Sequence, residues 1–184
     1  MPPLPSETGR TPPPPPAGAA RPVPVFVWVL VGLAVGFIPI VLILALVIPT
    51  IGSMKKRANE AAAIQTIRAI YQAQLQYQDT YPANGYACAL TALGGDPGAG
   101  PPSATAAQIL QPDMTSGFKS GYIFAISNCT KETVKGADLY TGFVITAVPQ
   151  KVGKTGNRGF CDDQFGTITY DPDGGANCTR TFAR

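Results

Sequence analysis

Histidine is absent from this chain of 184 residues, which also has only four cysteines and one tryptophan. Without histidine, a Ser-His or Cys-His nucleophile pair and a mixed His/Cys metal site are excluded. The sequence also contains no glycine-rich phosphate-binding loop that ends in lysine. A pair of carboxylates could still catalyse hydrolysis, but such enzymes usually need a deeper cleft than a small, loop-rich domain provides. We therefore expect no enzymatic activity.

Charged residues are absent from Val23 to Ile51. This run exceeds the ~20 apolar residues that a helix needs to cross a bilayer, so it predicts a transmembrane helix over residues 23–51. A cleaved secretory signal is the alternative, but its apolar region is only about 7–15 residues long. Pro39 and Pro49 would bend the helix, which membrane helices tolerate better than soluble ones do.

Residues 1–22 precede this run and are rich in proline, with five consecutive prolines from Pro12 to Pro16. Such a segment cannot bury enough apolar surface to fold and favours extended polyproline II. We expect a disordered tail. It would serve either as a docking site for a proline-recognising partner or as a flexible spacer.

An amphipathic helix is predicted over residues 53–81, directly after the apolar run. Its larger apolar side chains recur every three or four residues and form one stripe, which needs a partner surface. The residues of this stripe are Ile64, Ile67, Tyr71 and Leu75. Polar residues are expected on the other faces, namely Glu60, Gln65, Arg68, Gln72 and Gln76. Tyr81-Pro82 ends the helix.

The rest of the chain predicts a loop over residues 82–117 and a small antiparallel sheet over residues 118–184. In the loop, SATAAQIL could form one helical turn. Three or four strands follow, all rich in β-branched and aromatic residues. The candidates are residues 121–127, 139–148, 159–161 and 166–170. The segment NCTKETVKGAD between the first two is rich in turn residues, so we expect it to be a loop. Packing of the helix stripe on this sheet would give an α+β fold.

Two signals for the orientation in the membrane disagree. Arg10 and Arg21 precede the apolar run while three basic residues follow it, from Lys55 to Arg57, so the positive-inside rule places the C-terminal part in the cytoplasm. The cysteines indicate the opposite, because they are even in number and form no CxxC pair. These are Cys88, Cys129, Cys161 and Cys178. We give the cysteines more weight and expect a single-pass protein of the cytoplasmic membrane with its C-terminal domain, residues 52–184, outside the cytoplasm.

The stretch ALVIPTIGSMKKRANEAAAIQTIRAIYQAQLQYQDTYP resembles the helix of type IV pilins and type II secretion pseudopilins. In that family an apolar helix passes through Ile-Pro, here Ile48-Pro49, into basic residues and an ANEA segment, here residues 58–61. An IxxIRxIxxAQ pattern follows over residues 64–74. KSGYIFAI and TGNRGFCDDQFGTITYDPDG are similar to the second half of the family. The resemblance implies a pilin-like fold and a subunit or accessory of a type IV pilus or secretion pseudopilus.

The chain departs from the family at the processing site. Filament-forming members are cleaved after a glycine that precedes an aromatic residue, with glutamate at the fifth mature position. Here Gly36-Phe37 is the only such pair in the apolar run, and the fifth residue counted from Phe37 is Val41. We therefore expect an uncleaved anchor. A second function stays open, namely a non-polymerising membrane protein with a pilin-like binding head and a cytoplasmic proline-rich docking tail.

Four cysteines allow three disulfide connectivities, which sequence alone does not distinguish. The resemblance implies a disulfide near the C-terminus. We expect Cys88 to pair with Cys129 and Cys161 with Cys178. Free cysteines are the alternative and would fit a cytoplasmic domain.

Ligand-binding candidates are few. Some pseudopilins bind calcium near the C-terminus, and the matching carboxylates here are Asp162, Asp163, Asp171 and Asp173. Turn formation explains the same residues without a metal, so we expect no cofactor. After Gly52 there are twelve Lys or Arg and ten Asp or Glu, so we expect no nucleic-acid partner. The expected partners are membrane lipid and other pilin-like subunits, including copies of this chain.

Overall fold

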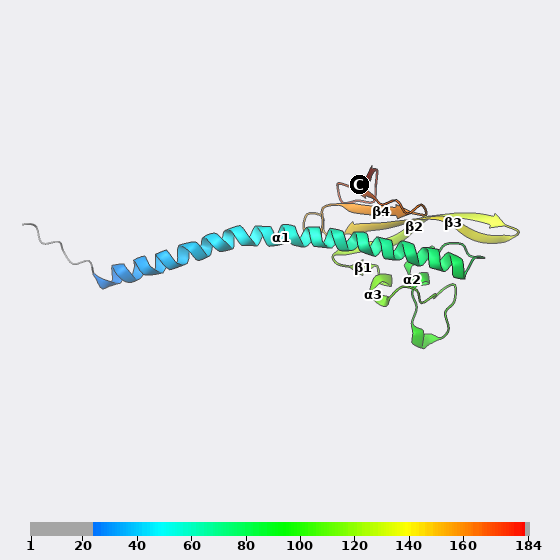
Figure 1. Ribbon diagram of the computed structural model, residues 1–184, viewed down its shortest axis with the longest axis horizontal. Helices are drawn as coiled ribbons and strands as arrows, with labels where there is room; N and C mark the ends of the chain where they lie inside the picture. The colour runs from blue at the N-terminus through cyan, green and yellow to red at the C-terminus, as the bar shows by residue number, and fades with distance from the viewer. Residues whose placement is uncertain (1–23, 183–184) are drawn as a thin grey trace, which may run out of the picture. The chain divides into compact units, whose positions relative to one another are not determined.

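The computed structural model describes residues 24–182 and divides the chain into two compact units, residues 1–45 and residues 46–184. The expected proline-rich tail, residues 1–22, lies outside the described residues. Helix α1, Val25–Thr80, contributes to both units (Figure 1). Each unit is therefore described by itself.

The first unit contains the apolar part of α1. Val25–Ile43 is a stretch of 19 residues with a mean hydropathy of 2.8, and it is the one candidate membrane span among the described residues. None of it is buried within the protein, and Trp28, for example, is 67% exposed. At 1.5 Å per residue the stretch is about 28 Å long, close to the thickness of a bilayer core. It is long and apolar enough to cross a membrane. We call it the apolar span.

The second unit combines the C-terminal part of α1 with an antiparallel sheet, the α+β combination that we expected. Among the described residues the sheet has six strands, each paired with the next in the chain. They are β1 Phe118–Lys119, β2 Tyr122–Val134, β3 Ala137–Pro149, β4 Gly159–Asp163, β5 Thr169–Asp171 and β6 Arg180–Thr181. Figure 1 shows the sheet lying along the C-terminal part of α1. We refer to this second unit as the head.

The prediction of a loop at NCTKETVKGAD was wrong. Strands β2 and β3 continue through it and pair as far as Val134 and Ala137, leaving only Lys135 and Gly136 as the turn. Both turn residues have positive φ, 53° and 82°, as a type I′ hairpin turn requires. The strands here are polar and exposed, so they lack the apolar alternation from which strands are predicted. A bulge follows Ser127, where the register shifts before Thr130.

The segment between helix and sheet also differs from the prediction. SATAAQIL forms no helical turn, and Ser103 instead makes a bridge with Ala106. The short helices lie elsewhere: α2 is Leu90–Leu93, η1 is Pro97–Ala99 and α3 is Pro112–Thr115. The segment folds back on α2, because the N–H groups of Ala107 and Leu110 donate to carbonyls of Ala92 and Leu93. Apolar residues tie it to the core, which explains how so long a connection stays compact.

One hydrophobic core joins α1, this connection and the inner face of the sheet. Its fully buried larger members include Ile67, Ile70, Leu93, Tyr122 and Phe143. Alternate residues of β4 lie on opposite faces, so Phe160 and Asp162 face α1 while Cys161 lies on the outer face.

Candidate functional site at the junction of helix and sheet

The expected packing stripe of α1 is only partly the face that the structure buries. Ile67 is fully buried, and Ile64 and Tyr71 are half-buried against the core. Leu75 is half-buried and lies outside the core cluster. The buried row runs instead through Glu60, Ala63, Ile67, Ile70, Gln74 and Tyr77. The contact face is therefore rotated from the stripe of large apolar side chains.

Small and polar residues explain this rotation. Ala63 lets the sheet approach α1 closely, and a search for large apolar side chains overlooks it. Glu60 and Gln74 are buried although their polar groups would ordinarily face water. Each is acceptable inside the protein only because it is hydrogen-bonded there. The prediction that Glu60 lies on a polar face was wrong for this reason, whereas the other four polar residues that we placed there are exposed.

Glu60 is the centre of a clamp between α1 and the loop that precedes β4. Its Oε1 accepts hydrogen bonds from the N–H groups of Asn157, at 2.9 Å, and Arg158, at 3.3 Å. Its Oε2 accepts from Nε and Nη2 of Arg158 at 3.0 and 2.7 Å. One helical position away, Nδ2 of Asn59 donates to the carbonyl of Thr155 at 2.8 Å. Two motifs far apart in sequence, ANEA and TGNRGF, thus form a single contact.

The clamp sets the protonation state of its members. Burial raises the pKa of the Glu60 carboxyl, but the hydrogen bonds from Asn157 and Arg158 outweigh it, so this pKa lies below its ordinary value. The hydroxyl of Tyr122 donates to the carbonyl of Arg158 at 2.9 Å. Burial and the nearby Glu60 charge raise the pKa of Tyr122. Glu60 is therefore a carboxylate and Tyr122 a neutral hydrogen-bond donor at physiological pH.

Aromatic rings enclose the other side of the Arg158 guanidinium. Its Cζ lies 5.6 Å from the ring centroids of Phe160 and Tyr170 and 5.4 Å from that of Phe182. These are cation–π distances. Both glycines of TGNRGF are required by close approach, because a Cβ at Gly156 would collide with Tyr122 and one at Gly159 with the backbone of Gly175. The TGNRGF motif thus positions the side chain of Arg158.

A second clamp holds the connection that follows α1. Nε2 of Gln74 donates to the carbonyl of Ala87 at 2.7 Å, and the N–H of Ala87 donates to Oε1 of Gln74 at 2.8 Å. Both groups are fully paired, as burial requires. The adjacent Cys88 is bonded to Cys129 in the bulge of β2. The amide pair and this disulfide fix the connection at neighbouring points.

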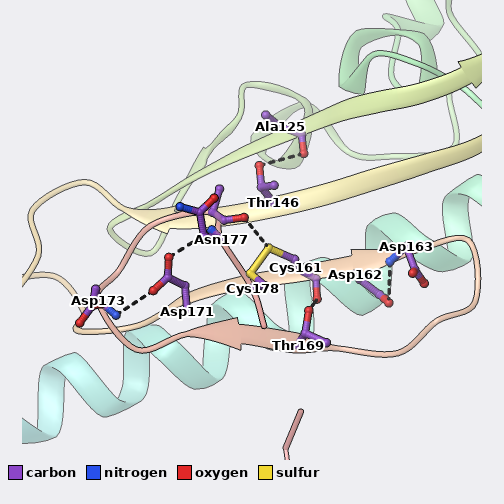
Figure 2. Close-up of a disulfide and its surroundings, with 11 residues drawn as sticks. Ala125, Thr146, Cys161, Asp162, Asp163, Thr169, Asp171, Asp173, Asn177 and Cys178 are labelled. Carbon is purple, nitrogen blue, oxygen red and sulfur yellow. Dashed lines mark hydrogen bonds between the residues drawn. A yellow bond between two sulfur atoms is a disulfide. The ribbon is translucent and has the colours of Figure 1, made fainter. Parts of the chain in front are cut away.

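Both disulfides have the pairing that we expected. The second joins Cys161 of β4 to Cys178 and closes the C-terminal segment onto the sheet (Figure 2). Their sequence separations are 41 and 17 residues. Disulfides that close loops of this length reduce the conformational freedom of the unfolded chain and so stabilise a small domain.

The four calcium candidates do not converge. Among residues 24–182, no group of three or more His, Cys, Asp or Glu side chains could hold a metal ion. Asp171 instead accepts hydrogen bonds from the N–H groups of Asp173 and Asn177, at 2.9 and 3.1 Å (Figure 2). Asp163 accepts from the N–H of Phe165 at 2.9 Å. These are the turn-forming contacts by which Asp stabilises a tight loop.

Asp162 lies in a groove at the junction of α1 and the sheet. The groove has a volume of about 770 Å³ and is lined by residues of α1, including Ile64, Arg68 and Tyr71, and by Asp162 and Phe182. Asp162 is only 3% exposed, and its Oδ1 accepts from the N–H of Asp163 at 3.0 Å. Burial raises its pKa to about 6. A carboxyl with this pKa changes charge just below neutral pH.

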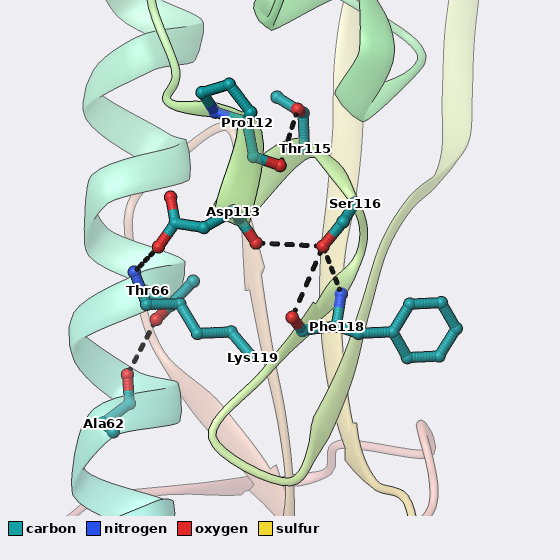
Figure 3. A network of polar contacts seen from close by, with 8 residues as sticks. All are labelled: Ala62, Thr66, Pro112, Asp113, Thr115, Ser116, Phe118 and Lys119. Carbon is teal, nitrogen blue, oxygen red and sulfur yellow. Dashed lines mark hydrogen bonds and ion pairs between the residues drawn. The ribbon is translucent and has the colours of Figure 1, made fainter.

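A separate polar network connects α3 to β1. Asp113 of α3 forms an ion pair with Lys119 of β1 at 2.6 Å, and the Ser116 hydroxyl donates to the carbonyl of Asp113 (Figure 3). The same hydroxyl accepts from the N–H of Phe118, while Thr66 donates to a carbonyl of its own helix. These groups bind one another, so we assign this region a structural role. The pair is exposed to solvent, which screens its charges.

No protein-family model, curated protein or solved structure compared with this chain matches it. The junction must therefore be interpreted from its own geometry. It offers hydrogen bonds, an arginine beside three aromatic rings and apolar packing, all of which hold a helix on a sheet.

Proposed function

We propose that this chain is a membrane-anchored, pilin-like structural protein, a subunit or accessory of a type IV pilus or a type II secretion pseudopilus. Its apolar span anchors it in the cytoplasmic membrane, with the disulfide-bonded head outside the cytoplasm. The head is not an enzyme and needs no cofactor.

One observation carries the proposal. A single helix is apolar on all sides over Val25–Ile43 and then, from Glu60 onward, buries one face against an antiparallel sheet. The first property suits a bilayer, and the second builds a head on the same helix. The resemblance in the ANEA and TGNRGF motifs supports the same function, because these residues form the clamp between helix and sheet.

The test is whether copies of the chain associate through this helix. A photo-cross-linking residue, p-benzoylphenylalanine, replaces Leu33 or Phe37 in the apolar span of the chain expressed in its own cells. We expect irradiation to give adducts at two or more times the mass of one chain. The same residue in place of Lys135, exposed in the turn between β2 and β3, is the control and should give none.

Adducts that contain a single copy of the chain, from both positions in a chain that still inserts, would contradict assembly. The non-polymerising binding head with a docking tail would then be the better interpretation. In that case deletion of residues 1–16 should abolish partner capture while leaving export intact.

A further inference from the structure

Two basic groups that are remote in sequence lie at the same end of the head. One group is Lys55, Lys56 and Arg57 of α1, and the other is Lys151 and Lys154 in the connection from β3 to β4. We call these five residues the basic surface. Among the described residues, none of the five forms an ion pair. The sequence presents them as two unrelated runs.

Specific hydrogen bonds bring the two groups together. Asn59, one turn after Lys55, donates to the carbonyl of Thr155, the residue that follows Lys154. The loop is closed on itself, because the N–H of Thr155 donates to the carbonyl of Lys151 at 2.9 Å. The clamp at Glu60 holds the next residues of the connection. Lys151 and Lys154 are thus presented by a fixed loop beside the helix.

The composition of this end of the head favours an anionic, partly apolar partner. Val152 lies between the two loop lysines and is 57% exposed. A groove of about 320 Å³ at the clamp is lined in part by Lys56, Arg57 and Asn157. The nearby carboxylate of Glu60 is already paired with Arg158. The exposed Asp173 lies near the edge of this surface, because a Cβ on the following Gly174 would meet the Val152 side chain.

The position of the basic surface along α1 identifies the partner. Lys55 follows the last residue of the apolar run, Ile51, by four residues, which is about 6 Å along a helix. Asn59 follows it by eight residues, about 12 Å. The headgroup layer on each side of a bilayer core is roughly 5–8 Å thick. The long side chains of the loop lysines can therefore reach headgroups when the bilayer core ends at Ile51 rather than at Ile43, the last residue of the apolar span, so that residues 32–51 cross the core.

We propose that the basic surface binds the phosphate groups of anionic phospholipids and so holds the head against the membrane. This inference rests on the proposed membrane anchor. Basic residues beside a membrane segment are attracted to anionic lipid, and an exposed valine between them adds apolar contact. Nucleic acid is a poorer candidate, because the head as a whole is nearly neutral, with twelve Lys or Arg and ten Asp or Glu after Gly52.

The experiment measures how fast each lysine of the full chain is acetylated by an uncharged N-hydroxysuccinimide ester. The chain is placed in lipid nanodiscs of phosphatidylcholine alone, or in nanodiscs in which phosphatidylglycerol replaces about a third of the lipid. We expect acetylation of Lys151 and Lys154 to slow by about threefold or more in the anionic discs. Lys131 and Lys135, at the opposite end of the β2–β3 hairpin, are internal controls and should keep their rates.

Equal rates for Lys151 and Lys154 in the two kinds of disc would overturn the inference while leaving the anchor intact. Protection by inorganic phosphate or by duplex DNA in phosphatidylcholine discs would also overturn it, in favour of a general anion site or a nucleic-acid surface. A chain that fails to enter even the phosphatidylcholine discs would contradict the proposed anchor itself.

Discussion

Helix α1 contains two regions that share a helical backbone but differ in how their apolar and polar side chains are arranged. In Val25–Ile43 the apolar side chains point to all sides and none of the span is buried in the protein. From Glu60 to Tyr77 one face is buried, and that face includes a carboxylate and an amide as well as isoleucines. The comparison shows that the surroundings of a helix depend on how its side chains are distributed around it. Polar residues can belong to a core where their hydrogen bonds are complete.

Substitutions in one region should therefore not affect the other. A change in the apolar span should alter membrane insertion and leave the stability of the head unchanged. A change in the clamp should do the reverse. Four sets of substitutions are given in order of decreasing expected effect. The first two test this separation, and the last two ask what stabilises the head.

Two charges in the apolar span should have the largest effect. The double substitution Leu33→Arg/Phe37→Arg places both near the middle of the span, at about 3 kcal/mol each on insertion scales. We expect most of the chain to become extractable from membranes by alkaline carbonate. The head should unfold at an unchanged denaturant midpoint, measured by near-ultraviolet circular dichroism. The control Leu33→Ile/Phe37→Leu should insert normally, and a destabilised head would contradict the separation of the two regions.

Removal of the Glu60 carboxylate should destabilise the head without affecting insertion. Glu60→Ala leaves the Arg158 side chain and two backbone N–H groups without their acceptor, and each buried N–H group that loses its acceptor costs about 1–3 kcal/mol. Urea unfolding of the detergent-solubilised chain measures the loss. Gln72→Ala, on the exposed face of the same helix, is the control and should change stability by less than about 0.5 kcal/mol. An equal loss in both variants would show that the clamp is unimportant.

The disulfides should contribute according to the loops that they close. With sequence separations of 41 and 17 residues, the chain-entropy relation gives about 4 kcal/mol for Cys88–Cys129 and about 3 kcal/mol for Cys161–Cys178. We expect Cys88→Ser/Cys129→Ser to lower the unfolding free energy more than Cys161→Ser/Cys178→Ser. The reverse order would mean that local packing, rather than loop length, decides their contribution.

Asp162→Asn should stabilise the head at neutral pH, the smallest of the four effects. The folded-state pKa of Asp162, about 6, is above the unfolded value of about 3.9, so the folded state binds its proton more tightly. Stability from this group is present below pH ~4 and is lost as the pH rises to about 6. The substitution should therefore add about 1–2 kcal/mol at pH 7 and almost nothing at pH 4. Unfolding at both pH values measures this, and a gain that is independent of pH would contradict burial as the cause.

Much of this architecture could be predicted from the sequence, because it depends on local patterns. The uncharged run predicts the apolar span, and the three-and-four spacing of Ile64, Ile67 and Tyr71 predicts a helix that packs on one side. The strands rich in β-branched residues were found for the same reason. These signals lie within one element, so a single sequence displays them.

The features that were missed depend on contacts between distant segments. Nothing near Glu60 in the sequence indicates that Arg158 will pair with it, and nothing near Gln74 indicates Ala87. The hairpin beyond Ser127 was missed because its strands are exposed and its Lys-Gly turn is a weaker signal than Asn-Gly. A glutamate within an otherwise small and apolar helix face, together with an arginine flanked by glycines, was the available clue to the clamp.

Protease accessibility of the head in spheroplasts tests the central claim most directly. A protease added outside spheroplasts that express the full chain should degrade the head after the disulfides are reduced, and the apolar span should stay in the carbonate-washed membrane. That result would support a single-pass anchor with the head outside the cytoplasm. A head that is cut only after the membrane is opened with detergent, or a chain that carbonate releases, would contradict it.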